Sequence, residues 1–293
     1  MNKNYTFLGF QPECFICWLR RGHAAIKNLS DNRHLQLKVI QEVAKRLGQL
    51  PLGTPYDPAF IYWFQKYISQ VTGGKDPWGQ IKKNLNQMAL QFYPLLKEHV
   101  SRSRDPLLTA AILAGAGNIL DEVDGSNFSL EKSIASSLEE GFKYADYQEF
   151  KNLLSGSRRV LYVADNAGEI VFDRLLLEEI SNHQITYVVK GSPLSSDVTI
   201  EDAKFAGIDA VANVVSTEVE YPLRIVGSKV KELAHALDKA DVIISKGQLN
   251  YGRLTYQLER SAFYLVRIKC NNFRESFASK GNFAIGEVVL IQQ

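Results

Sequence analysis

The sequence predicts an α/β protein in which a helical N-terminal region precedes a mostly parallel β-sheet. Two patterns predict this class. Apolar residues recur at three- and four-residue spacing up to about residue 150, and short β-rich runs then alternate with helical stretches. The change falls after Ser155-Gly156-Ser157, so we expect a helical region over residues 1–155 and an α/β domain over residues 156–293.

The first region has the spacing and the start signals of helices. Five of its apolar residues share one helical face: Leu35, Val39, Ile40, Val43 and Leu47. Asp105 followed by Pro106 is typical of a helix start, because aspartate caps the first turn and proline suits the first helical position. Gly-Ser-Asn at 125–127 then interrupts the helical pattern.

The second region alternates strand-like and helical stretches, as parallel strands with crossover helices do. The predicted strands are 160–164, 185–189, 211–215, 242–245, 264–268 and 288–291, and helical patterns cover 172–180 and 226–237. We find no internal repeat in the chain.

Composition excludes several classes of function. The 34 Lys and Arg residues nearly balance the 32 Asp and Glu residues, and a net charge of +2 argues against a nucleic-acid-binding or anionic-membrane surface. No apolar run reaches the roughly 18 residues of a membrane span, and the start lacks the apolar segment of a signal peptide. Three cysteines fit a reducing compartment better than a disulfide framework, so we expect a cytoplasmic protein.

Polar residues follow three of the predicted strands directly. They lie in the segments 165–169, 190–193 with Asp197 and Asp202 beyond it, and 246–251. Parallel strands bring these segments to one edge of the sheet, where open α/β sheets bind their ligands. Asp165, Asn166 and Asp197 offer hard oxygen ligands for Mg²⁺ or Mn²⁺. Lys190 and Lys246 supply positive charge for an anion such as phosphate, which completes a phosphoryl-transfer site.

Each of these segments also has a purely structural interpretation. Asp165-Asn166-Ala167-Gly168 is compatible with a capped strand-to-helix turn, and the two lysines with solvated strand ends. Asp197 or Asp202 is compatible with helix capping. The expected meeting of all three segments at one edge is what favours a functional site.

Six ordered segments together resemble the damage-control phosphatase family, which was once described as carboxyl methyltransferases. They are ADNAGE (164–169), KGSP (190–193), DVT (197–199), EDA (201–203), ADV (240–242) and KGQ (246–248). CFIC (14–17), AGAGNILD (114–121) and Lys269-Cys270 are similar to the prokaryotic branch of this family, so the resemblance covers most of the chain.

The resemblance implies a helical region packed on a Rossmann-like αβα domain. It also implies a divalent metal ion, Mn, Mg, Co or Ni, held by Asp165, Asn166 and Asp197, with Lys246 facing the substrate phosphate. The implied reaction is hydrolysis of a phosphate monoester on a sugar phosphate or on a normal or damaged cofactor-related metabolite. Whether metal-bound water or the Asp165 carboxylate attacks is left open.

The expected catalytic residues are Asp165, Lys246 and Glu169. Glu169 is either a base behind the metal or a first-turn carboxylate favoured by the helix dipole, and both alternatives stay open. Asn118 and Asp121 lie three apart on a predicted helix, so both can point into the cleft. The expected substrate-binding residues are Asn118, Asp121, Lys190, Gly247 and Asn250.

Two other functions stay open beside the phosphatase. Glu218 and Leu223 stand where glycine is common in the family, and Gly252 lies where an acidic residue is common, so a metabolite-binding protein without turnover is one alternative. The other is a methyltransferase that uses S-adenosylmethionine, because that fold also begins its sheet with an acidic, glycine-containing turn. The oligomeric state is not predicted.

Two weaker signals do not alter this interpretation. Gly115-Ala116-Gly117 lies within a helical pattern without a preceding strand, which argues against a dinucleotide loop. Cys14 and Cys17 have a metal-ligand spacing, but one pair is weak evidence for zinc even with Cys270 and His23 available.

Overall fold

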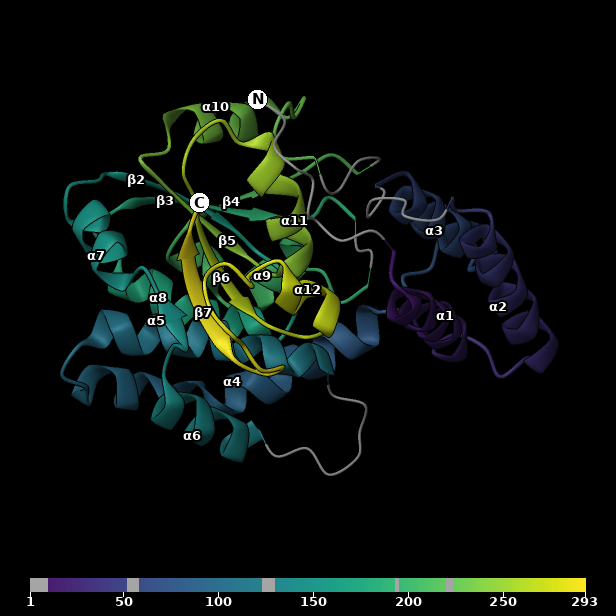
Figure 1. The fold of residues 1–293 in the computed structure, drawn as a ribbon, viewed down its shortest axis with the longest axis horizontal. Helices are drawn as coiled ribbons and strands as arrows, with labels where there is room; N and C mark the ends of the chain where they lie inside the picture. Colours follow the sequence, from purple (N-terminus) through teal and green to yellow (C-terminus); the bar gives the residue numbers. More distant parts are fainter. Residues whose placement is uncertain (1–9, 52–57, 123–129, 193–194, 220–223) are drawn as a thin grey trace. The chain divides into compact units, whose positions relative to one another are not determined.

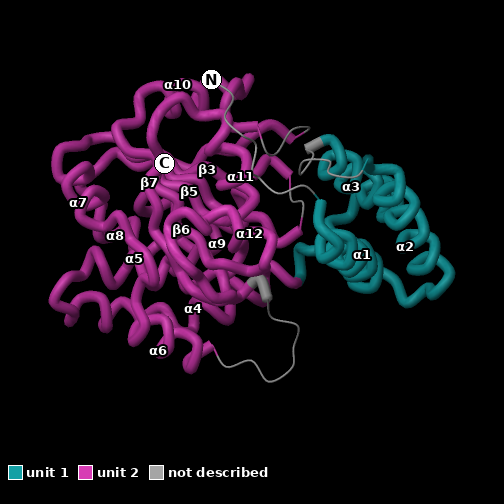
Figure 2. Tube along the Cα trace, in the orientation of Figure 1, with its two compact units in different colours: residues 1–80 teal, residues 81–293 magenta. Residues whose placement is uncertain are grey.

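The computed structural model describes residues 10–51, 58–122, 130–192, 195–219 and 224–293. Backbone contacts divide the chain into two compact units, residues 1–80 and 81–293 (Figure 2). Each unit is described by itself.

The first unit consists of helices around an aromatic core. Its described helices are α1 (Pro12–Lys27), α2 (Arg33–Gly48) and α3 (Pro58–Val71). Val39, Val43 and Leu47 of α2 are buried, as their spacing predicted. The Trp18 ring of α1 packs edge-on against Phe60 and Phe64 of α3, with ring centroids 5.0 and 4.9 Å apart.

The second unit begins with helices that share a core with the sheet. They are α4 (Gly79–Arg102), α5 (Pro106–Ala116), the short 3-10 helix η1 (Gly117–Glu122), α6 (Leu130–Glu140) and α7 (Tyr147–Ser155). The Asp105 carboxylate accepts the Leu108 N–H at 3.2 Å, so α5 begins where its cap predicted. Residues 110–116 of α5 are all buried, and Ala110, Ala111, Leu113 and Ala114 lie in one apolar cluster with Tyr162 of the sheet.

This shared core explains why the two compact units have a different boundary from the one expected from the sequence. The sequence pattern changes from helical to alternating strands and helices near residue 155, but the boundary between the units lies between residues 80 and 81. A change from helices to strands does not end a domain when the helices bury their apolar faces against the strands.

The described residues form a seven-stranded sheet in the order β1-β7-β6-β5-β2-β3-β4 (Figure 1). The strands are β1 (Tyr144–Ala145), β2 (Arg159–Val163), β3 (Gln184–Val189), β4 (Asn213–Ser216), β5 (Val242–Lys246), β6 (Phe263–Arg267) and β7 (Val288–Gln292). Every neighbouring pair is parallel except β6 and β7. The six predicted strands and the mostly parallel sheet are thus confirmed, while β1 is too short for a periodic signal.

Helices cover both faces of this sheet. The helices that follow the first long strand are α8 (Glu169–Glu179), α9 (Ile200–Phe205), η2 (Ile208–Ala210), α10 (Lys231–Lys239), α11 (Gln248–Gln257) and α12 (Asn271–Glu275). In Figure 1, α5 and α8 lie on one side of the sheet and α10 and α11 on the other. The α/β class is therefore a three-layer αβα arrangement. No helix in the described ranges has the length and apolarity that a bilayer crossing requires.

Strand order reverses between β2 and β5. From β2 the chain adds β3 and β4 on one side, and it then returns to place β5 on the other side of β2. The loops that leave β2 and β5 diverge at such a point and leave a crevice at the carboxyl ends of the strands. The polar segments singled out in the sequence follow these strand ends.

Candidate metal and phosphate site

The candidate site lies at the carboxyl ends of β2, β3 and β5. Asp165 and Asn166 follow β2, Lys190 follows β3, and Gly247 follows β5. Because β2 pairs with both β3 and β5, the three strand ends are adjacent, as expected from a parallel sheet.

A short extended segment places Asp197 in this group. The Val198 N–H donates to the Asp165 carbonyl at 3.0 Å, and the Val198 carbonyl accepts the Lys190 N–H at 2.8 Å. The segment thus continues the sheet beyond the ends of β2 and β3, and Asn166 and Asp197 form an antiparallel β-bridge. Asp165, Asn166 and Asp197 are all buried, with 8%, 8% and 6% of their surface exposed.

Gly247 gives the Asp165 carboxylate its space. Its φ of 84° lies in the left-handed region, and a Cβ at this position would overlap the carboxylate oxygens of Asp165. Gly247 was expected to bind substrate; in the structure the group that its Cα adjoins is this carboxylate.

Two asparagines orient Asp165. Oδ2 of Asp165 accepts hydrogen bonds from Nδ2 of Asn118 at 3.2 Å and of Asn166 at 2.8 Å. Asn118 Nδ2 also donates to Oε2 of Glu169 at 2.5 Å, while Ser196 donates its hydroxyl to Oδ1 of Asn166 at 2.9 Å. Oδ1 of Asn118 is buried and has no hydrogen-bond partner among the described residues.

Lys190 lies beside the two carboxylates and is itself buried. Its Nζ donates to Oδ1 of Asn250 at 2.7 Å, and Nδ2 of Asn250 is held by the carbonyls of Ala164 and Lys246. Burial lowers the pKa of Lys190, and the charges of Asp197 and Asp165 act in the opposite direction. Of the expected substrate-binding residues, Lys190 thus lies at the end of β3, and Asn250 in the first turn of α11 supports it.

Lys246 lies elsewhere than expected. Its ammonium donates to the Ala114 carbonyl at 2.7 Å, to Oδ1 of Asp173 at 2.7 Å and to Oε1 of Glu169, and its side chain is fully buried. An ammonium has three donors, and these three acceptors use all of them. Side chains alternate along β5, so Lys246 lies on the same face of the strand as Ile244. Ile244 is buried in the apolar cluster to which residues of α8 also belong. This corrects the expectation that Lys246 faces the substrate phosphate.

The position of Glu169 fits both of the roles that the sequence left open, and the role of a base behind the metal stays a prediction. It stands in the first turn of α8, and its buried carboxylate also hydrogen-bonds both asparagine amides next to Asp165. Burial raises the pKa of Glu169, with the Lys246 charge acting in the opposite direction.

The donor chemistry of the group fits a hard divalent cation. Within the described ranges, no cluster of three or more His, Cys, Asp and Glu side chains is arranged to hold a metal ion. The candidate ligands are instead two carboxylates, Asp165 and Asp197, together with amide oxygens. Such an oxygen set, with the buried acceptor Asn118 Oδ1 beside it, suits Mg²⁺ or Mn²⁺ rather than a metal that prefers sulfur.

Asp202, the second acidic residue beyond β3, has a structural role. Oδ2 of Asp202 accepts the Thr199 N–H at 3.0 Å and the Thr199 hydroxyl at 2.8 Å, and the capping box of α9 is complete. Lys82 and Asn86 of α4 also donate to its carboxylate. Asn86 in turn accepts the Gly168 N–H at 2.5 Å, so Asp202 supports the loop after β2 from behind.

Some expected residues lie partly or wholly outside the described structure. Asp121 belongs to η1, but its side chain is not described. Leu223 and Pro193 lie outside the described residues. Glu218 is described, and its carboxylate closes its own loop by accepting from Ser228 at 3.0 Å, the Lys229 N–H at 3.0 Å and Arg224 at 3.3 Å.

Three charged residues near the site had no expected role in it, although one of them, Lys269, belongs to the Lys269-Cys270 segment that resembles the family. Asp173 lies four residues after Glu169, so helical spacing on α8 was the signal that both carboxylates share a face. Arg253 of α11 acts electrostatically on Lys190, and Lys269, which follows β6 closely, acts on Glu169. These two basic residues had no local motif that pointed to phosphate.

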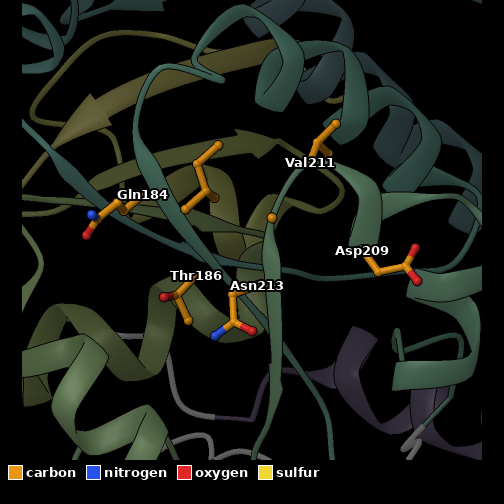
Figure 3. A pocket seen from close by; sticks show the side chains of 7 residues that line it. Gln184, Thr186, Asp209, Val211 and Asn213 are labelled. Carbon is orange, nitrogen blue, oxygen red and sulfur yellow. The ribbon is translucent and has the colours of Figure 1, made fainter.

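A shallow hollow lies at the opposite end of the sheet. Figure 3 shows its lining around the first residues of β3 and β4, among them Gln184, Thr186 and Asn213. Lys190 follows the far end of β3, so this hollow is separate from the candidate site.

The fold and the residues at its switch point define a doubly wound α/β protein of the class that binds ligands where the strand order reverses. Residues 10–282 match the family model for the damage-control phosphatase ARMT1-like domain. This chain belongs to that family and is therefore a phosphatase, a hydrolase that acts on small or damaged metabolites.

Individual relatives agree with this assignment. The chain is 34% identical over 266 residues to a damage-control phosphatase from Archaeoglobus fulgidus, an alignment that covers 88% of this chain and 92% of that protein. It is 28% identical over 269 residues to a damage-control phosphatase from Pyrococcus horikoshii, covering 89% and 91%. The crystal structure of a DUF89 family protein from Pyrococcus horikoshii aligns with a TM-score of 0.82 at 25% identity, covering 97% of this chain and 98% of that one. Of the functions weighed from the sequence, family membership supports the phosphatase.

Proposed function

We propose that this phosphatase hydrolyses phosphate monoesters of small metabolites, either sugar phosphates or normal or damaged cofactor-related metabolites, with a divalent metal ion as cofactor. The observation that carries the proposal is the juxtaposition of Asp165, Asn166 and Asp197 with the buried Lys190 at the strand ends. Oxygen ligands next to a lysine combine a cation site with an anion site, which phosphoryl transfer requires.

The metal would be held by the carboxylates of Asp165 and Asp197 and by the amide oxygen of Asn166. When bound, Mg²⁺, Mn²⁺, Co²⁺ or Ni²⁺ supplies a Lewis acid that polarises a phosphoryl oxygen. The hydrogen bonds from Asn118 and Asn166 fix the Asp165 carboxylate before any ligand arrives. Such preorganisation means that little rearrangement is needed during the reaction.

Lys190 and Lys246 were both expected to supply positive charge for phosphate, and we assign the contact with phosphate to Lys190 alone. Among the described residues its ammonium has one hydrogen-bond acceptor, Asn250, so two of its three donors are available for phosphoryl oxygens. The charges of Arg253 and Lys269 add to the positive potential around the strand ends. Three basic groups near two carboxylates favour a small, highly charged phosphate ester.

The composition of the chain supports a proposal for the enzyme's partner and its location. Its partner is a small phosphorylated metabolite rather than nucleic acid, because the chain's net charge is only +2. The odd number of cysteines supports a reducing, cytoplasmic location.

Phosphate release from a panel of phosphorylated metabolites tests the proposal. The metal-stripped protein is assayed alone and with Mg²⁺, Mn²⁺, Co²⁺ or Ni²⁺. We expect turnover of at least one sugar phosphate or damaged cofactor-related ester only when metal is present. Equal turnover by the metal-stripped protein would contradict the metal role, while no turnover of any ester under any condition would contradict the substrate class.

A further inference from the structure

A fully buried network connects the candidate site to the core beneath α8. Asp173 lies one helical turn after Glu169, and both side chains are at most 1% exposed. Both carboxylates accept from the single ammonium of Lys246. The network reaches the candidate metal ligand because Glu169 accepts Nδ2 of Asn118, which also donates to Asp165.

Two tyrosines fix the far end of this network. Tyr162 of β2 donates its hydroxyl to Oδ1 of Asp173 at 2.7 Å, and Tyr187 of β3 donates to Oδ2 at 2.8 Å. Their rings stack with centroids 5.3 Å apart and are completely buried. Asp173 is thus held from the two strands whose ends carry Asp165 and Lys190.

The charges of this network do not balance by themselves. One ammonium faces two carboxylates, so the set of Lys246, Glu169 and Asp173 bears a net negative charge inside the protein. Buried ions are costly unless they are paired and hydrogen-bonded. The tyrosine hydroxyls and asparagine amides supply hydrogen bonds to these carboxylates, and Lys269 adds a positive charge near Glu169.

We propose that Asp173 is a positioning residue for the metal site. By sharing the Lys246 ammonium it leaves Glu169 with negative charge toward the Asn118 amide, and this amide orients the Asp165 carboxylate. This inference rests on the proposed metal-dependent function. It assigns to Asp173, Tyr162 and Tyr187 a role that the sequence reasoning did not foresee.

Asp173→Asn is the central test, because it removes the charge and keeps the size of the side chain. Lys246 then has Glu169 as its sole carboxylate partner and neutralises it more completely. We expect the dissociation constant for Mn²⁺, measured by calorimetry on metal-stripped protein, to rise by about tenfold, since one negative charge near a divalent cation is lost. A purely structural role would lower the melting temperature and leave this constant unchanged.

Glu178→Gln is the matched control on the same helix. Glu178 also accepts from a tyrosine, Tyr93, and from Lys97 and Arg174, but it lies away from the strand ends. The control should lose stability and bind Mn²⁺ as the unaltered protein does. Equal Mn²⁺ dissociation constants for Asp173→Asn, Glu178→Gln and the unaltered protein would overturn the inference.

A tyrosine pair keeps the test decisive where Asp173→Asn does not fold. Tyr187→Phe removes one of the hydrogen bonds that fix Asp173, and Tyr93→Phe removes the equivalent bond to Glu178. We expect the dissociation constant for Mn²⁺ to rise by roughly threefold in Tyr187→Phe alone, because the Asp173 carboxylate keeps its charge but is less well oriented. No difference between these two variants would overturn the inference, whereas failure of the unaltered protein to bind Mn²⁺ would overturn the proposed metal site together with it.

Discussion

The Asp165 carboxylate lies against the Cα of Gly247, at a point where any side chain on residue 247 would overlap it. The loop after β2 and the loop after β5 are therefore in close contact at the switch point of the sheet. The space for the candidate metal ligand is created by the absence of a side chain on Gly247, the residue that follows the neighbouring strand β5.

Gly247→Ala should abolish metal-dependent turnover. The substitution displaces Asp165 and also introduces a side chain at a φ of 84°. Gly227→Ala is the matched control, since Gly227 has a φ of 70° but open space around it. We expect both variants to lose about 1–2 kcal/mol of unfolding free energy from the backbone conformation, with further loss at Gly247. Denaturant titration and phosphate release measure the two effects, and an active Gly247→Ala enzyme would refute the close approach.

Asp165→Ala should remove metal-dependent hydrolysis while the protein stays folded. The residue follows a strand end and contributes oxygen ligands more than apolar packing. Circular dichroism checks the fold and phosphate release checks the activity. Undiminished turnover in a folded variant would remove Asp165 from the site.

The two buried lysines should respond differently to replacement by methionine. Lys190→Met is expected to lower kcat/KM by about a hundredfold, as the loss of one preorganised charge does, with little change in stability. Lys246→Met leaves Glu169 and Asp173 without their ammonium and is expected to cost about 3–5 kcal/mol of unfolding free energy. The reverse pattern, a stable but inactive Lys246→Met enzyme, would restore the role first expected from the sequence.

Asp197 and Asp202 should separate metal binding from scaffolding. Asp197→Asn removes a charge next to Asn166, so we expect weaker Mn²⁺ binding by calorimetry and a nearly unchanged melting temperature. Asp202→Asn weakens the ion pair with Lys82 and the cap of α9, so we expect a lower melting temperature and unaltered Mn²⁺ binding. If the dissociation constant for Mn²⁺ is unchanged in Asp197→Asn and raised in Asp202→Asn, Asp202 rather than Asp197 is the metal ligand.

Most of the fold was readable from the sequence because its signals are local. Periodicity predicted the parallel strands, and Asp105 with Pro106 marked the start of α5. The domain boundary was not readable, because it depends on which helices share a core with the sheet, and Leu113 of α5 packs in the same apolar cluster as Tyr162 of β2.

The sequence by itself determined the α/β class, the family resemblance and the strand ends at which Asp165, Asn166 and Lys190 lie. These follow from residue order, because parallel strands carry their following residues to one edge. Only the tertiary structure decided that Asp197 bridges Asn166 while Asp202 caps a helix, and that Lys246 lies in the core with Glu169 and Asp173. The face of β5 that α8 covers, and the carboxylates that Lys246 contacts there, depend on packing between segments far apart in the chain.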